Sequence, residues 1–136
     1  MIEIADASEV SRATLYNHYR DKESVLLALC ESELARLVEI AQKAPDATTA
    51  LEQISLQVSS DSALAAMRIQ DPDQLTLALT KHDDHLWKAF AIAMTHLLGE
   101  GKSSLALRWL LGQALHPINA QQSRAQAEAI TGIANL

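Results

Sequence analysis

Apolar residues recur at helical spacing along most of the chain. A period close to 3.6 residues runs through positions 22–43 and predicts one long helix there. The spacing i, i+3, i+7 recurs at Leu51, Ile54 and Val58. After residue 84 a continuous apolar stripe consists of Trp87, Phe90, Ala91, Met94, Leu97 and Leu98. These patterns predict an all-α protein.

Few residues interrupt the helical patterns. The chain has four glycines and three prolines, and no glycine precedes Gly99. Since sandwiches and barrels need turn residues roughly every 8–12 positions, this composition argues against both. Asp71, Pro72 and Gln74 have the spacing of a helix start. Gly99 or Gly101 is expected to end the preceding helix.

Two further helices are expected near the C-terminus. The helix predicted over residues 103–115 is apolar on nearly all sides, so it should be buried in a core or at a subunit interface. Asn119 or Ser123 should cap the last helix. Its inward positions are expected to be Ala127, Ile130, Ile133 and Ala134.

Composition and charge limit the classes of function. The chain has 136 residues and a net charge of −6, which fits one modest domain without a generally basic surface. A small DNA-reading face remains compatible with this charge. A single cysteine, Cys30, excludes an intrachain disulfide, and the N-terminus lacks the features of a signal peptide. No apolar run is long enough to span a bilayer. We therefore expect a cytoplasmic protein that does not enter membranes.

The first 23 residues carry the most specific pattern in the chain. Two short helices, over residues 2–8 and about 11–19, are joined by a tight turn and followed by the long helix. This is the helix-turn-helix pattern, whose second helix enters the major groove of DNA. Ala5, Val10 and Leu15 are placed to pack between the two helices. The outer faces then carry Arg12, Ala13, Thr14, Tyr16, Asn17 and His18, which include residue types that contact base edges and phosphates.

The segment VSRATLYNHYRDKE, residues 10–23, resembles the recognition-helix signature of TetR/AcrR-type transcriptional regulators. The resemblance implies that Arg12, Ala13 and Asn17 face bases. It implies that the phosphates are contacted by Thr14, Tyr16, His18 and Lys22. Residues 1–22 would then form an incomplete helix-turn-helix domain, because the family normally has a further helix before this motif.

The same resemblance implies an architecture and a mechanism. Residues 23–136 would form a helical domain that binds a small-molecule effector and dimerises. The homodimer would use about residues 102–136 and bind a palindromic double-stranded DNA operator. Effector binding would shift the helix over residues 22–43, and the two recognition helices would lose their spacing on DNA. The expected function is therefore a ligand-responsive regulator, with repression favoured over activation.

A second interpretation stays open. Residues 1–22 hold three basic side chains and four acidic ones, which is a weak charge pattern for binding phosphates. Glu9 also stands in the turn where the family usually has glycine. The alternative is a truncated or degenerate dimeric helical module that binds a small molecule or a partner without specific DNA binding.

Other candidate sites are less specific. Trp87, Phe90, Met94 and Trp109 are candidates for lining the effector pocket, or they are ordinary core residues. The sequence His-Asp-Asp-His at 82–85 resembles a metal site, but acidic residues at a helix N-terminus explain it better, and no third ligand is fixed. We predict no metal site and no cofactor. No phosphate loop, nucleophile elbow or carboxylate pair indicates an enzyme.

Overall fold

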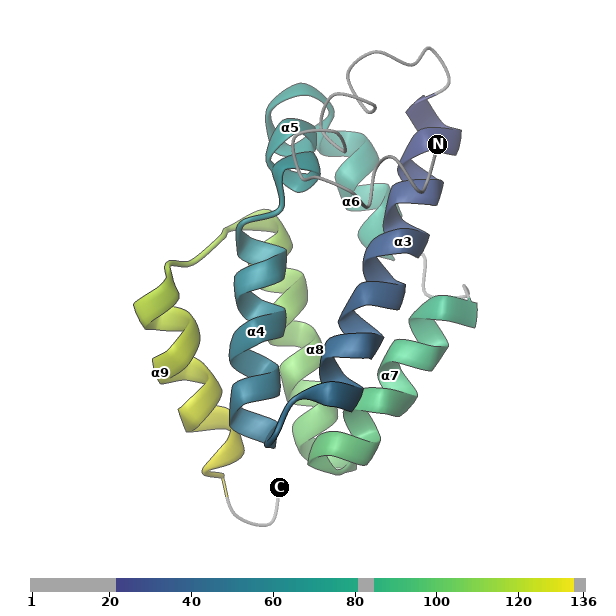
Figure 1. Ribbon diagram of the computed structural model, residues 1–136. Coiled ribbons are helices and arrows are strands. Elements are labelled where there is room, and N and C mark those ends of the chain that lie inside the picture. Colours follow the sequence, from purple (N-terminus) through teal and green to yellow (C-terminus); the bar gives the residue numbers. More distant parts are fainter. Residues whose placement is uncertain (1–21, 81–84, 134–136) are drawn as a thin grey trace.

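The computed structural model describes residues 22–80 and 85–133, and all secondary structure in these ranges is α-helical (Figure 1). The predicted all-α fold is confirmed. The long helix also has the predicted bounds, whereas the two short helices predicted before residue 20 lie outside the described residues. The described helices are α3 (Lys22–Lys43), α4 (Ala47–Ser59), α5 (Ser62–Gln70), α6 (Pro72–Thr80), α7 (His85–Leu98), α8 (Glu100–Leu115) and α9 (Ala120–Thr131).

Helix α4 lies at the centre of the bundle. It packs against α3, α8 and α9, while α7 lies along α3 and α8. The short helices α5 and α6 pack against each other beyond the end of α4, beside the first turns of α3 (Figure 1). The molecule therefore has a large bundle with a small helical hairpin at one end, and α3 runs alongside both.

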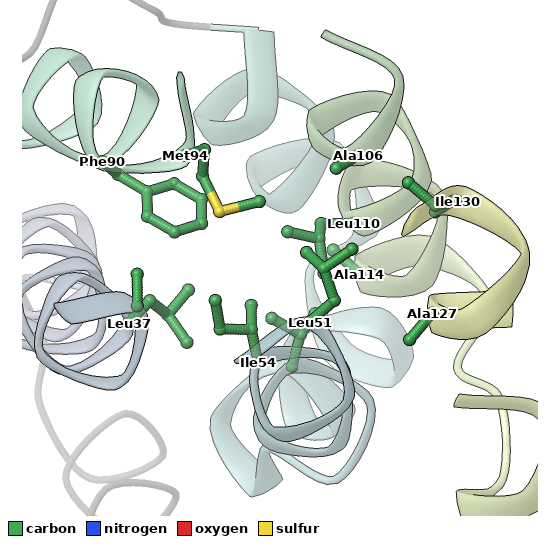
Figure 2. Close-up of a cluster of buried hydrophobic side chains, with 12 residues drawn as sticks. Leu37, Leu51, Ile54, Phe90, Met94, Ala106, Leu110, Ala114, Ala127 and Ile130 are labelled. Carbon is green, nitrogen blue, oxygen red and sulfur yellow. The ribbon is translucent and has the colours of Figure 1, made fainter. Parts of the chain in front are cut away.

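The main core fills the space between α3, α4, α7, α8 and α9. Phe90 and Met94 point into it from α7, and Leu51 and Ile54 meet them from α4 (Figure 2). These four side chains are at most 1% exposed. Truncating a buried side chain of this size to alanine costs about 2–5 kcal/mol, so these residues dominate the stability of the bundle. The burial that the i, i+3, i+7 spacing predicts for the α4 residues is confirmed.

Side-chain caps set several helix boundaries. The Asp46 carboxylate accepts from the Thr49 amide over 2.7 Å at the start of α4. Asn119 and Gln122 form a reciprocal capping box at the start of α9, with bonds of 2.8 and 3.0 Å. Asn119 is thus the cap of the last helix, and the alternative cap, Ser123, is instead fully buried within α9.

Three boundaries differ from the prediction. Helix α8 begins at Glu100 and not at Ser103, so Gly101 lies inside this helix and Gly99, with φ of 86°, separates α7 from α8. The apolar pattern also gave no break between α4 and α5. The buried carboxylate of Asp61 makes this break, because it accepts from the Ala63 amide over 2.9 Å and starts a new helix.

The end of α9 also differs. The helix ends at Thr131, so Ile133 follows it and is only half-buried, whereas Ala127 and Ile130 are buried as predicted. Ala134 lies outside the described residues. None of the described helices has both the length and the hydropathy that a membrane span requires.

Candidate DNA-reading and effector-response elements

Most of the predicted DNA contacts precede the described part of the chain. Arg12, Ala13, Thr14, Tyr16, Asn17 and His18 lie outside the described residues, and Lys22 is the first residue of α3. Their roles remain predictions. The structure instead describes the helix that follows the predicted reading segment and the elements that hold this helix.

The first half of α3 packs against the α5–α6 hairpin. Val25 and Leu29 are each 4% exposed and form a small cluster with residues of the two short helices. The hairpin contributes the buried residues Ala63, Met67 and Leu75 to this cluster. The helix that leaves the predicted reading segment is therefore held by α5 and α6 before it reaches the main core.

The second half of α3 belongs to the main core. Leu37 and Ala41 pack there with residues of α4 and α7. Leu64 of α5 and Leu79 of α6 pack against both hydrophobic clusters. Rigid elements carry displacement along their length, so a change in the bundle can reach the first turns of α3 along two routes: α3 itself and the hairpin.

A buried polar network joins α4, α8 and α9. The Ser55 and Ser59 hydroxyls donate to Oε1 of Gln113 over 2.6 and 2.7 Å. Because the Ser55 proton is used in this bond, the Ser123 hydroxyl must donate to Ser55 across their 2.7 Å contact. Ser59 also accepts from the Ile118 amide over 3.1 Å. The network fixes the relative positions of three helices.

Gln113 is a candidate functional residue that was not predicted from the sequence. It is 2% exposed, and its Nε2 makes no hydrogen bond to any described residue. A buried amide donor without a partner lowers the stability of the fold. The sequence feature that could have indicated a polar contact in the interior is Ser55, which directly follows the apolar Ile54 on α4. Both residues are buried.

The aromatic residues predicted as pocket lining have mixed surroundings. Phe90 and Met94 are packed in the main core (Figure 2). The Trp87 ring lies 6.1 Å from the Phe90 ring, and Trp109 donates from Nε1 to Gln126 Oε1 over 2.7 Å, which ties α8 to α9. In this conformation Phe90 and Met94 fill the core, and a pocket-lining role for all four residues stays a prediction.

A shallow cavity of about 350 Å³ lies between the C-terminal halves of α3 and α7. Its lining contains none of the four predicted residues and consists of Ala41, Gln42, Ala93, His96 and Leu97. His82 and the two aspartates after it fall in the gap of the description, so the metal interpretation of 82–85 is not tested. Within the described ranges no group of three or more metal-ligating side chains occurs.

Helix α8 has two distinct faces. The inward face is buried and consists of Ser103, Ala106, Leu110, Gln113 and Ala114. The outward face carries the large apolar residues Leu105 and Leu115, which are 37% and 43% exposed. Between them lie the partly buried Leu111 and the exposed Arg108 and Gly112. Burial in a core is therefore confirmed for the inward face, and a subunit interface on the outward face stays a prediction.

Comparison with known proteins bears on the N-terminal segment. Residues 1–29 match the family model described as bacterial regulatory proteins, tetR family. No curated protein and no solved structure matches the chain. The matched residues include the predicted helix-turn-helix and the first eight residues of α3, up to the buried Leu29. By this N-terminal segment, the chain is similar to the tetR family of bacterial regulatory proteins.

Proposed function

We propose that the chain is a ligand-responsive transcriptional repressor that binds a palindromic DNA operator as a homodimer. The family match over residues 1–29 is the observation that carries the proposal, since it covers the segment predicted to read DNA. The match ends inside α3, which continues without interruption to Lys43 beside the main core. One continuous helix thus joins the predicted reading segment to the bundle.

The outward face of α8 supports the proposed homodimer. Leu105 and Leu115 expose apolar surface, and Gly112 between them allows a second helix to approach closely. On α9 the exposed residues Ala125 and Ala129 are also small. Helix α9 and all but the first two residues of α8 lie within the range of about residues 102–136 that the family resemblance assigns to the dimer. A two-fold dimer would place two reading segments on one operator.

Effector response requires a site in the bundle and a path to α3. The Nε2 of Gln113 offers a polar contact, and Trp109, four residues earlier on α8, offers apolar surface. A ligand changes DNA binding only if its affinity differs between the two arrangements of α3. The position of α3 against both hydrophobic clusters supports such a difference, because moving this helix alters packing in each of them.

A fluorescence anisotropy titration tests the proposal. The probe is a labelled duplex from the DNA that flanks the gene, and a scrambled duplex is the control. We expect tighter binding to the flanking DNA than to the scramble, with affinity falling steeply as salt concentration rises, because phosphate contacts release counterions. Equal affinity for both duplexes at every salt concentration would contradict the proposal.

The second candidate is a dimeric helical module without specific DNA binding. The excess of acidic over basic side chains in residues 1–22, together with the net charge of −6, favours this candidate. The two candidates differ in the titration above and agree on dimerisation through α8 and α9. Tighter binding to the flanking DNA than to the scramble rejects the module. A dimer with equal affinity for both duplexes supports it.

A further inference from the structure

Arg68 forms a hydrogen bond between helices α5 and α8. It lies in the last turn of α5, and its Nη1 donates to the backbone carbonyl of Ala114 over 2.6 Å. Ala114 belongs to the last turn of α8, where the helix itself supplies no partner for the carbonyls. The guanidinium thus acts as a C-cap for α8 and also lies at the negative end of its dipole.

The surroundings of Arg68 hold the side chain in place. Its pKa is lowered by burial, which disfavours the charged form, and the nearby Asp61 carboxylate opposes this shift. Asp61 is 1% exposed and caps the start of the same helix through the Ala63 amide. A guanidinium stays charged under all ordinary conditions, so a part-buried one depends on its carbonyl and carboxylate neighbours.

The other side of α5 faces α3. Ala63 and Met67 are both 2% exposed and pack in the cluster that holds Val25 and Leu29. Helix α5 packs chiefly against α6, and α8 packs chiefly against α7 and α4. The Arg68 bond therefore spans two elements that otherwise touch little.

We propose that Arg68 is a positioning residue for DNA reading, which ties the C-terminal end of α8 to the hairpin that holds the first half of α3. The inference rests on the proposed function, because α3 begins within the family-matched segment. The end of α8 also carries Leu115 on the proposed dimer face. Arg68 thus makes the orientation of the reading segment depend on the state of the dimer interface. The two states differ in whether the bond from Arg68 to Ala114 is made or broken.

Hydrogen exchange on the full chain tests the connection without DNA. The variants are Arg68→Ala, Arg68→Lys and the control Arg124→Ala. Arg124 is a suitable control because it also joins two helices, with bonds of 3.3 Å to Glu52 of α4 and 2.7 Å to Glu128 of α9. We expect Arg68→Ala to speed amide exchange in residues 22–29 by about tenfold or more while the helical circular dichroism signal is kept. Arg68→Lys should restore protection, and Arg124→Ala should leave these residues unchanged.

The two Arg68 variants are then compared in DNA binding. Arg68→Ala should weaken binding to the flanking duplex by at least about fivefold, with recovery in Arg68→Lys. Unchanged exchange in residues 22–29 of Arg68→Ala, or equal acceleration in Arg124→Ala, would overturn the inference. If Arg68→Ala does not fold, Arg68→Lys tests the inference alone. A folded Arg68→Lys protein that lacks amide protection in residues 22–29 would then overturn the inference. Failure of the unmodified chain to prefer flanking DNA would reject the proposed function alone, since exchange still tests the connection.

Discussion

Individual polar residues explain much of how the bundle is specified. Gln113 accepts two serine hydroxyl bonds in the interior, and a third serine completes the network. A buried polar group is tolerated when its partners are present and is costly when they are removed. The relative positions of α4, α8 and α9 therefore depend on a few hydrogen bonds as well as on apolar packing.

The Gln113→Ala substitution measures this dependence. It removes the acceptor of Ser55 and Ser59 and leaves a void, so we expect the free energy of unfolding to fall by about 2–4 kcal/mol. The control is Gln126→Ala, which removes the half-buried acceptor of Trp109 and should cost about 1 kcal/mol or less. Urea denaturation followed by circular dichroism gives both values. Equal losses of unfolding free energy in the two variants would show that the buried network stabilises the protein no more than the half-buried Trp109–Gln126 bond.

Asp46 gives a prediction for acid pH. Its pKa is lowered, first by the hydrogen bond from the Thr49 backbone amide and then by the Thr49 hydroxyl. A carboxylate whose folded pKa is depressed stabilises the protein above its unfolded pKa and loses this effect as pH falls through the folded value. The Tm of the unmodified chain should therefore fall on acidification below the ordinary aspartate pKa of 3.8.

The Asp46→Asn variant isolates this contribution. Asparagine keeps the capping oxygen but does not titrate, so its Tm should fall less steeply over the same acid range. Thermal melts of both proteins between about pH 6 and pH 2 provide the comparison. A constant difference in Tm across this range would contradict the assignment of the pH dependence to the Asp46 carboxylate.

The helices show which features follow from local sequence. Periodicity and caps predicted α3, the start of α6 at Pro72 and the cap of α9 at Asn119, because these depend on neighbouring residues. The break before α5 was missed because Asp61 acts as a cap while buried, and the apolar spacing does not register it. The early start of α8 was missed because its N-cap is Gly99, which has no capping side chain to mark a helix start.

Contacts between distant helices could not be predicted in the same way. The spacing of apolar residues does not indicate that Val25 and Leu29 pack against α5 and α6 rather than α4. The pocket prediction met the same difficulty, because Phe90 and Met94 have one spacing whether they line a pocket or fill a core. Which of the two applies depends on the elements packed opposite.

Helix α8 carries the prediction for the proposed dimer. Leu111 is partly buried in the single chain and lies near the outward face. The Leu111→Glu substitution should convert the dimer to a monomer or unfold it, because a charge buried at an interface without a partner is strongly destabilising. Analytical ultracentrifugation measures the mass in solution, and circular dichroism reports folding.

A matched variant is Ile92→Glu on α7. This side chain is 59% exposed and lies outside the proposed dimer helices, so the added charge should leave the mass of the dimer unchanged. A folded, dimeric Leu111→Glu protein would show that the interface lies elsewhere. Loss of the dimer only in Ile92→Glu would assign the interface to α7.

The whole molecule combines a predicted reading segment, a connecting helix and a bundle. The family match covers the first of these, and the described structure covers the other two. Helix α3 links them because its first turns belong to both the matched segment and the hairpin cluster. In the proposed function, residues near the N-terminus read bases while α8 and α9 pair two copies of the chain.

The most direct test is base discrimination by Asn17. Operator duplexes with single base-pair changes are compared in their binding to the unmodified chain and to Asn17→Ala. We expect Asn17→Ala to lose about 1–3 kcal/mol of base discrimination at one position in each of two symmetry-related half-sites, with the helical bundle unchanged. Unchanged discrimination at every operator position would contradict this expectation.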